Sequence, residues 1–390
     1  MKRKTWIIFG SLLVLVLLGI TVWYKLMRRE VAQPGWIAET KRDLFLYGSV
    51  GAEQEAGIPY WIWLAMPRMF PEQMPGNGGY VALGMSWEPG VEMPAGFSKK
   101  RVGYVRVAGN CALCHAASYR LGPDDGPEVV PFVPGRGRDV QSLLAFYKNC
   151  AEDPQFNAGE ILTEVKSATK LSWSDWLLYK FYLIPQTKKK FINQDTVIID
   201  SYLRLHSHDP HSKELLSQPQ MRAFTEALKD IQSPVYPLRA DATLAAQGKQ
   251  LFANHCSSCH AADGKQTGTV IPIGELDTDR EALKTTNAQG YVARPLNGVW
   301  MRGPYLHNGS VPTVRDLLDA TRPPSFYSGN NLLDTKKLGF ISDLAKPQEK
   351  GIHFTRYDAT QPGRSNSGHL YGTSLSDREK EAVVEYLKTL

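Results

Sequence analysis

The sequence predicts a mainly α-helical protein in which an N-terminal transmembrane helix precedes two further domains with long irregular loops. Three observations lead to this expectation: an uncharged apolar run at 5–24, a Cys-x-x-Cys-His motif present at both 111–115 and 256–260, and stretches with apolar residues at helical spacing. The 390 residues are enough for two domains after an anchor. We expect a membrane anchor at 1–30, an irregular membrane-proximal segment at 31–100, a first motif-bearing region at 101–235 and a C-terminal domain at 236–390.

The N-terminal run has the length of a membrane span. From Thr5 to Tyr24 the chain carries no charge, and as a helix this run would extend about 30 Å, the thickness of a bilayer's hydrocarbon core. Lysine and arginine flank it on both sides, and aromatic residues stand at its ends, where they favour the interface. A cleaved signal peptide is the alternative, but no small-residue cleavage site follows the run.

Each Cys-x-x-Cys-His motif is the attachment signature of a c-type haem. The cysteines would bind the porphyrin through thioether bonds, and the adjacent histidine would bind the iron. The residues are Cys111, Cys114 and His115 in the first copy and Cys256, Cys259 and His260 in the second. A zinc site or a thiol redox pair is the alternative, but Cys150 is the only other cysteine, and a redox pair does not require the histidine. We therefore predict two covalently attached c-type haems.

Haem attachment of this type takes place outside the cytoplasm, so it orients the predicted anchor. The haem domains would then lie in the periplasm, tethered to the cytoplasmic membrane by one N-terminal pass. The formal net charge is +6, and the four propionates of two haems would bring it close to neutrality. We therefore expect the membrane and a redox partner protein or a component of a membrane electron-transfer chain as partners, and no nucleic acid.

The region from 236 onward has a clearer pattern than the first haem region. Asp241 can cap a helix that ends near residue 254, and Ser376 can cap a second helix over 377–390. Gly248 has no side chain, so it would let these two helices approach closely where they cross. Together with Phe252 and the haem motif, this pattern resembles the cytochrome c fold. In such domains a backbone carbonyl fixes the proximal histidine, and the spacing from His260 suggests that of Pro272.

The sixth ligand of each iron decides between electron transfer and ligand chemistry. For the second haem we consider His369, Met301 and His307, and favour His369 because it lies in a loop shortly before the closing helix. For the first haem, an open site and a filled one remain alternatives, and the nearby candidates are His206, His208, His211 and Met221.

The run from Ala293 to Thr313, the loop around His369 and the closing segment 385–388 resemble dihaem cytochromes related to bacterial cytochrome c peroxidases and haem-dependent rubber oxygenases. A shorter resemblance covers 96–100 and 110–115. The resemblance as a whole, which is strongest over about 240–390, implies two interacting haems in mostly helical domains. It also implies His369 as a ligand of the second iron and Trp300 as a candidate aromatic residue between the haems. Further expected roles are propionate pairing for Arg294 and Arg302, turn formation for Tyr305 and Asn308, and capping of a helix over 314–320 by Thr313.

These features predict a membrane-anchored dihaem c-type cytochrome with two cytochrome c-like haem domains, which transfers single electrons on the periplasmic face of the membrane. The alternative is an enzyme, a dihaem peroxidase or oxygenase with an open coordination site on the first haem. A third hypothesis, haem as a structural element of a binding protein, fits the sequence least well.

Overall fold

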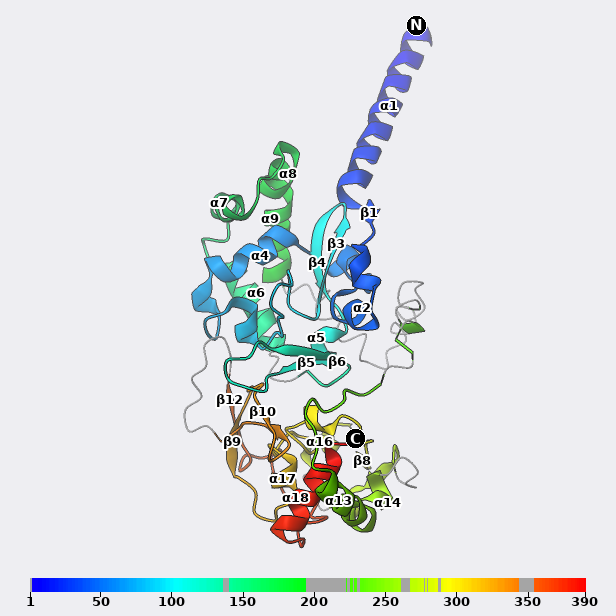
Figure 1. Cartoon of the computed structure of the whole chain (residues 1–390). Helices are drawn as coiled ribbons and strands as arrows, with labels where there is room; N and C mark the ends of the chain where they lie inside the picture. Colours follow the sequence, from blue (N-terminus) through cyan, green and yellow to red (C-terminus); the bar gives the residue numbers. More distant parts are fainter. Residues whose placement is uncertain are drawn as a thin grey trace. The chain divides into compact units, whose positions relative to one another are not determined.

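In the computed structural model the chain folds into two compact units (Figure 1). Unit 1 comprises Met1–Met85, Met93–Cys114 and Asp139–Asp230, and unit 2 comprises Ser86–Glu92, His115–Arg138 and Ile231–Leu390. The predicted domain boundaries near residues 30, 100 and 235 stay predictions. The structure describes residues 2–135, 140–193, 222, 225–226, 228–229, 232–260, 267–276, 278, 280–286, 289–343 and 354–390, and of residues 2–12, 282, 285 and 286 it describes the backbone.

The N-terminal helix α1 runs over Lys2–Met27. Throughout the described part of the chain, no helix combines the length and the apolar character that crossing a membrane requires. The predicted transmembrane helix is wrong, and so is the predicted single-pass N-terminal anchor in the cytoplasmic membrane.

Unit 1 contains a four-stranded antiparallel sheet, so helices do not account for the whole architecture and the fold-class prediction is wrong in this respect too. Its strand order is β1-β3-β4-β2. The central strands form a tight hairpin in which Val102 pairs with Tyr104 across Gly103. Gly103 has a φ of +75°, which glycine adopts without the strain that a side chain would add. The strands are β1 (Glu30–Val31), β2 (Ile58–Pro59), β3 (Phe97–Val102) and β4 (Tyr104–Gly109).

The core of unit 1 is largely aromatic. Trp63, which is fully buried, stacks on Tyr80 with ring centroids 4.3 Å apart and donates from Nε1 to the Tyr147 hydroxyl at 3.1 Å. The ring of Tyr147 in turn stacks on Phe191 at 5.0 Å. Three of these residues lie on helices of unit 1, Trp63 on α4, Tyr147 on α6 and Phe191 on α9. The helices described in unit 1 after α1 are α2 (Lys41–Tyr47), α3 (Glu53–Ala56), α4 (Tyr60–Met69), α6 (Val140–Glu152), α7 (Ala158–Ala168), α8 (Trp173–Leu178), the π-helix η4 (Tyr179–Leu183) and α9 (Ile184–Ile192), with short 3-10 turns η1 (Gly35–Ala38), η2 (Pro71–Gln73) and η3 (Gly79–Leu83).

Unit 2 is organised by the crossing of two helices, α13 (Ala242–His255) and α18 (Asp377–Leu387), as the sequence predicted. The Asp241 side chain accepts from two backbone amides at the start of α13, and Ser376 forms a capping box with Glu379 at the start of α18. A Cβ on Gly248 would lie 1.9 Å from the Ala382 carbonyl oxygen. The crossing therefore requires glycine at position 248.

The rest of unit 2 consists of short elements around one hydrophobic core. Trp300 and Met301 are buried there together with Phe252 of α13 and Val383 of α18. The helices are α14 (Ser257–His260), α15 (Ile273–Leu276), α16 (Glu281–Thr286), η5 (Val299–Met301) and α17 (Val314–Leu317). Four two-stranded antiparallel sheets pair β5 (Ala116–Tyr119) with β6 (Glu128–Pro131), β7 (Val270–Pro272) with β8 (Gly290–Val292), β9 (Ser325–Ser328) with β12 (Thr355–Asp358) and β10 (Leu333–Asp334) with β11 (Gly339–Phe340).

Candidate haem-binding sites

The first Cys-x-x-Cys-His motif forms a short helix, α5 (Ala112–His115), at the end of the hairpin of unit 1. Asn110 fixes the turn that leads into it: its amide nitrogen donates to the carbonyls of Leu46 (3.2 Å) and Gly48 (3.0 Å), and its Oδ1 accepts from the Ala112 amide (2.9 Å). Both motif cysteines are partly accessible, and His115 is exposed at the end of α5. Burial raises the pKa of the Cys111 thiol. The turn before the motif is thus held by the Asn110 side chain, while the two cysteines and the histidine of the motif remain accessible.

The second motif begins where α13 ends, inside unit 2. The Cys256 amide donates to the Phe252 carbonyl at 2.9 Å, and the His260 amide donates to the Cys256 carbonyl at 3.1 Å. Thr267 closes the turn by donating its hydroxyl to the Cys259 carbonyl at 2.6 Å. Burial, together with the neighbouring Cys259, raises the pKa of Cys256 to about 11, so the thiol is protonated at neutral pH.

The ring of His260 is oriented by a backbone carbonyl, as the sequence suggested, but the carbonyl comes from a different residue. His260 Nδ1 lies 3.0 Å from the Arg294 oxygen. Pro272 lies in β7, where it pairs with Gly290. With Nδ1 engaged by a carbonyl, Nε2 of His260 is the nitrogen that can bind a metal.

His369 faces His260 across a short gap. Their ring centroids are 6.1 Å apart, and the ring planes are inclined by 54°. An iron bonded to one nitrogen of each ring, at roughly 2 Å per bond, would place the two ring centres about 6.2 Å apart, because each nitrogen lies about 1.1 Å from its ring centre. The two rings therefore have the separation of axial ligands on opposite sides of one iron.

The surroundings of His369 also suit a metal ligand. Its Nδ1 is buried and has no hydrogen-bond partner within the described residues, a state that costs free energy unless another group binds there. Burial, followed by the proximity of His260, lowers the pKa of His369 to about 4, so its imidazole is neutral at pH 7. The backbone of His369 is left-handed, with φ of +50°, and its amide donates to the Leu276 carbonyl at 3.2 Å. The residues present therefore fit an iron held between two neutral imidazoles.

The other predicted residues have different surroundings. Met301 is fully buried in the core of unit 2, and His307 is exposed and stacks on Tyr291 with ring centroids 4.0 Å apart. Arg302 donates to the carbonyls of Pro295 (2.5 Å) and Asn297 (2.7 Å), and Arg294 is exposed. His206, His208, His211 and Met221 lie outside the described residues.

The expected turn residues do organise the segment after Trp300. The Tyr305 hydroxyl donates to the Val299 carbonyl (3.1 Å), and the Asn308 amide donates to the Ser365 carbonyl (2.9 Å). Thr313 caps α17 as predicted, although this helix ends at Leu317 rather than near residue 320.

An aromatic contact that the sequence did not indicate involves Trp300. The ring of Tyr119 packs edge-on against it with centroids 5.1 Å apart, and Trp300 Nε1 donates to the Pro234 carbonyl at 2.9 Å. Tyr119 lies on β5, which starts directly after His115. The strand that follows the first motif therefore packs against the core that holds the second. No local pattern in the sequence could reveal this pair, because 180 residues separate its members.

Comparison with known families identifies the region beside His260. Residues 290–328 match the RoxA-like, cytochrome c-like family. This segment includes the Arg294 carbonyl, Trp300 and the helix α17. The match implies c-type haem with its iron, and it indicates haem-based redox activity.

Two curated relatives are uncharacterized proteins of Sinorhizobium fredii. One, y4iJ, is 42% identical over 111 residues, which cover 26% of this chain and 18% of that protein. The other, y4iM, is 29% identical over 244 residues, which cover 46% of this chain and 56% of that protein. The chain therefore spans less than two thirds of the length of either relative.

Proposed function

We propose that this protein is a dihaem c-type cytochrome that transfers single electrons to or from a redox partner protein. One haem is attached at Cys256 and Cys259, with His260 and His369 as the axial ligands of its iron. The other is attached at Cys111 and Cys114, with His115 as its proximal ligand. The observation that carries the proposal is the 6.1 Å separation of the His260 and His369 rings directly beside a haem-attachment motif.

Electron transfer follows from a filled sixth position. His260 and His369 would hold the iron from two imidazole rings, and a haem bound in this way would supply one-electron redox chemistry. His369 is neutral at pH 7 and its backbone is anchored, so it is ready to bind without first losing a proton. This arrangement favours relay of electrons over reaction at the second iron.

Exposed apolar residues near the second site support both a haem and a partner. Leu370 and Tyr371 follow His369 directly and are 54% and 43% exposed, and Val270 faces Val292 across β7 and β8 with both side chains largely exposed. Apolar side chains grouped around a site are typical of surfaces that a ligand or a partner covers. A porphyrin would cover part of this group, and the remainder is suited to contact with a redox protein.

A second candidate function is a haem-dependent peroxidase or oxygenase whose open coordination site is on the first haem. The match of residues 290–328 to the RoxA-like, cytochrome c-like family favours this alternative. The two functions differ in the ligation of the first iron.

The test uses the full chain matured in a host that attaches c-type haem. Intact mass after denaturation and a pyridine haemochrome assay should give two thioether-linked haems per chain, and one or none would refute the dihaem proposal. Electron paramagnetic resonance of the ferric protein should show a low-spin signal from the second haem. His369→Ala should convert that signal to high spin, whereas His307→Ala, the matched control, should not.

The same samples distinguish the two functions. Two low-spin irons without peroxide or oxygen turnover support electron transfer. A high-spin ferric signal in the unmodified protein, with rapid cyanide binding at the first haem and turnover of peroxide or oxygen, supports the enzyme instead.

A further inference from the structure

Arg322 is a buried arginine whose hydrogen bonds converge on the loop that carries His369. Its relative exposure is 9%, and the motif-based prediction of the haem site did not include it. A guanidinium has five N–H donors in one rigid plane. In this structure its donors reach five different backbone carbonyl oxygens.

Three of these carbonyls belong to the His369 loop. Nη1 donates to the oxygens of Asn366 (2.5 Å) and Gly368 (2.8 Å), and Nη2 donates to the oxygen of His369 itself (3.0 Å). The loop includes two left-handed residues in succession, Gly368 with φ of +84° and His369 with φ of +50°. A non-glycine residue in this conformation is strained, so the bonds from Arg322 offset a local cost at the residue that carries the imidazole.

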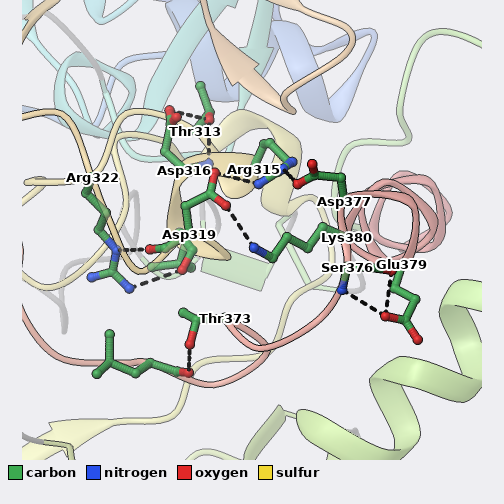
Figure 2. A network of polar contacts seen from close by, with 12 residues as sticks. Thr313, Arg315, Asp316, Asp319, Arg322, Thr373, Ser376, Asp377, Glu379 and Lys380 are labelled. Atoms are coloured by element: carbon green, nitrogen blue, oxygen red, sulfur yellow. Dashed lines mark hydrogen bonds and ion pairs between the residues drawn. The ribbon is translucent and has the colours of Figure 1, made fainter.

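The other two bonds tie Arg322 to the end of α17. Nη2 donates to the Leu317 carbonyl (3.1 Å) and Nε to the Asp319 carbonyl (3.2 Å). Figure 2 shows Arg322 next to Asp319, together with the ion pairs that Asp319 forms. The Asp319 carboxylate pairs with Arg315 (2.5 Å) and with Lys380 of α18 (2.9 Å).

Arg322 is therefore bonded to a segment that is linked to the crossing of α13 and α18. The Asp319–Lys380 pair links the end of α17 to α18, and α18 crosses α13, whose last turn leads into the second haem motif. The imidazoles of His369 and His260 are therefore both connected to the crossing of α13 and α18.

We propose that Arg322 is a positioning residue that holds the His369 loop so that the imidazole stays on the second haem iron. This inference rests on the proposed role of His369 as an axial ligand. Its geometry requires the planar fork of arginine, because lysine has three donors on one atom and cannot reach carbonyls on both sides. Without the fork, the loop relaxes and the sixth position opens part of the time.

The experiment compares haem-loaded variants of the full chain. Arg322→Lys keeps the positive charge and removes the fork, Arg322→Gln removes both, and His369→Ala is the open-site reference. Arg120→Lys is the matched control, because Arg120 is also a buried arginine of unit 2 (6% exposed), and it donates to Asn331 and Pro123. Circular dichroism and haem content verify that each variant is folded and loaded.

Two readouts report on the sixth ligand: the spin state of the ferric protein and the rate at which carbon monoxide binds the dithionite-reduced protein. In both Arg322 variants we expect a high-spin ferric fraction and a new carbon monoxide phase at least tenfold faster than in the unmodified protein. Arg120→Lys should match the unmodified protein in both readouts. In hydrogen exchange, the His369 amide should exchange faster in both Arg322 variants.

The outcomes separate this inference from the proposed function. If His369→Ala opens the site while both Arg322 variants keep the original spin state and rate, the positioning role is refuted and the ligand assignment stands. If Arg322→Lys is unchanged and only Arg322→Gln differs, Arg322 acts by charge, which also refutes positioning. Unchanged spectra in His369→Ala refute both proposals at once.

Discussion

Replacing Gly248 by alanine tests the closest approach in unit 2. A Cβ at this position would lie 1.9 Å from the Ala382 oxygen and 2.9 Å from the Tyr386 Cβ. Carbon and oxygen atoms in contact need roughly 3.3 Å, so α13 and α18 would have to move apart by about 1.4 Å. Neither obstacle can yield by rotating a side chain, because one is a backbone carbonyl and the other a Cβ atom.

The separation of the helices loosens the side chains between them. Phe252, Val383 and Val384 are each at most 5% exposed, and burying such a side chain is worth about 1.5–3 kcal/mol. A gap of up to 1 Å already forfeits a quarter to a half of a dispersion contact. Together these terms predict that Gly248→Ala lowers the free energy of unfolding of unit 2 by about 3 kcal/mol.

Native-state hydrogen exchange over the amides of α13 and α18 measures this loss in unit 2 directly. Gly274→Ala is the control, because a Cβ at Gly274 of α15 meets nothing within 4 Å, and its effect should stay within about 0.5 kcal/mol. If Gly248→Ala is as stable as Gly274→Ala, the helices do not depend on this glycine and the reasoning fails.

Two further predictions concern the first motif and the ion pairs of α17. Asn110→Ala removes three hydrogen bonds at the entrance to α5, so unit 1 should lose about 3 kcal/mol in urea unfolding and carry less haem at the first motif. Unchanged stability and haem content would contradict the anchoring role. Burial opposes ionisation of Asp319, but hydrogen bonds from Arg315 and Lys380 outweigh it and lower the pKa of this carboxyl. A lowered carboxyl pKa stabilises the fold above the pKa of the unfolded chain, near 4, and this stability is lost as the pH falls through the folded value. Asp319→Asn should therefore flatten the acid side of the pH–stability profile, and a profile as steep as that of the unmodified protein would contradict the prediction.

Features determined by neighbouring residues could be predicted from the sequence. The caps at Asp241 and Ser376 are satisfied by amides two or three residues further on, so the pattern of residue types contains the whole interaction. Gly248 was recognisable for a similar reason, since a glycine within a helical pattern marks a close approach. The pairing of His369 with His260 was suggested by the position of a histidine just before the closing helix, and the structure brings the two rings to 6.1 Å.

Features that depend on distant parts of the chain could not be predicted. The carbonyl that contacts His260 belongs to Arg294. The spacing after the motif predicted the carbonyl of Pro272 instead, because residue spacing alone does not show which part of a later loop lies beside the histidine. Arg322 carries no signal in the sequence, since an arginine is expected on the surface until its five acceptors are known. The uncharged run at 5–24 predicted a membrane span because of its length, its basic flanks and its terminal aromatic residues, and this prediction was wrong.

The partners of both His260 and Arg322 are main-chain oxygens, and every residue type supplies the same oxygen. Substitutions at Arg294, Leu317 or Asn366 leave these acceptors in place, so a mutational scan would score those positions as tolerant although their atoms orient the two imidazoles. Substitutions would be poorly tolerated at the residues that contact these oxygens with their side chains, His260 and Arg322. In such a scan, these particular contacts would therefore be visible at the donors, His260 and Arg322, and hidden at the residues that supply the carbonyl oxygens.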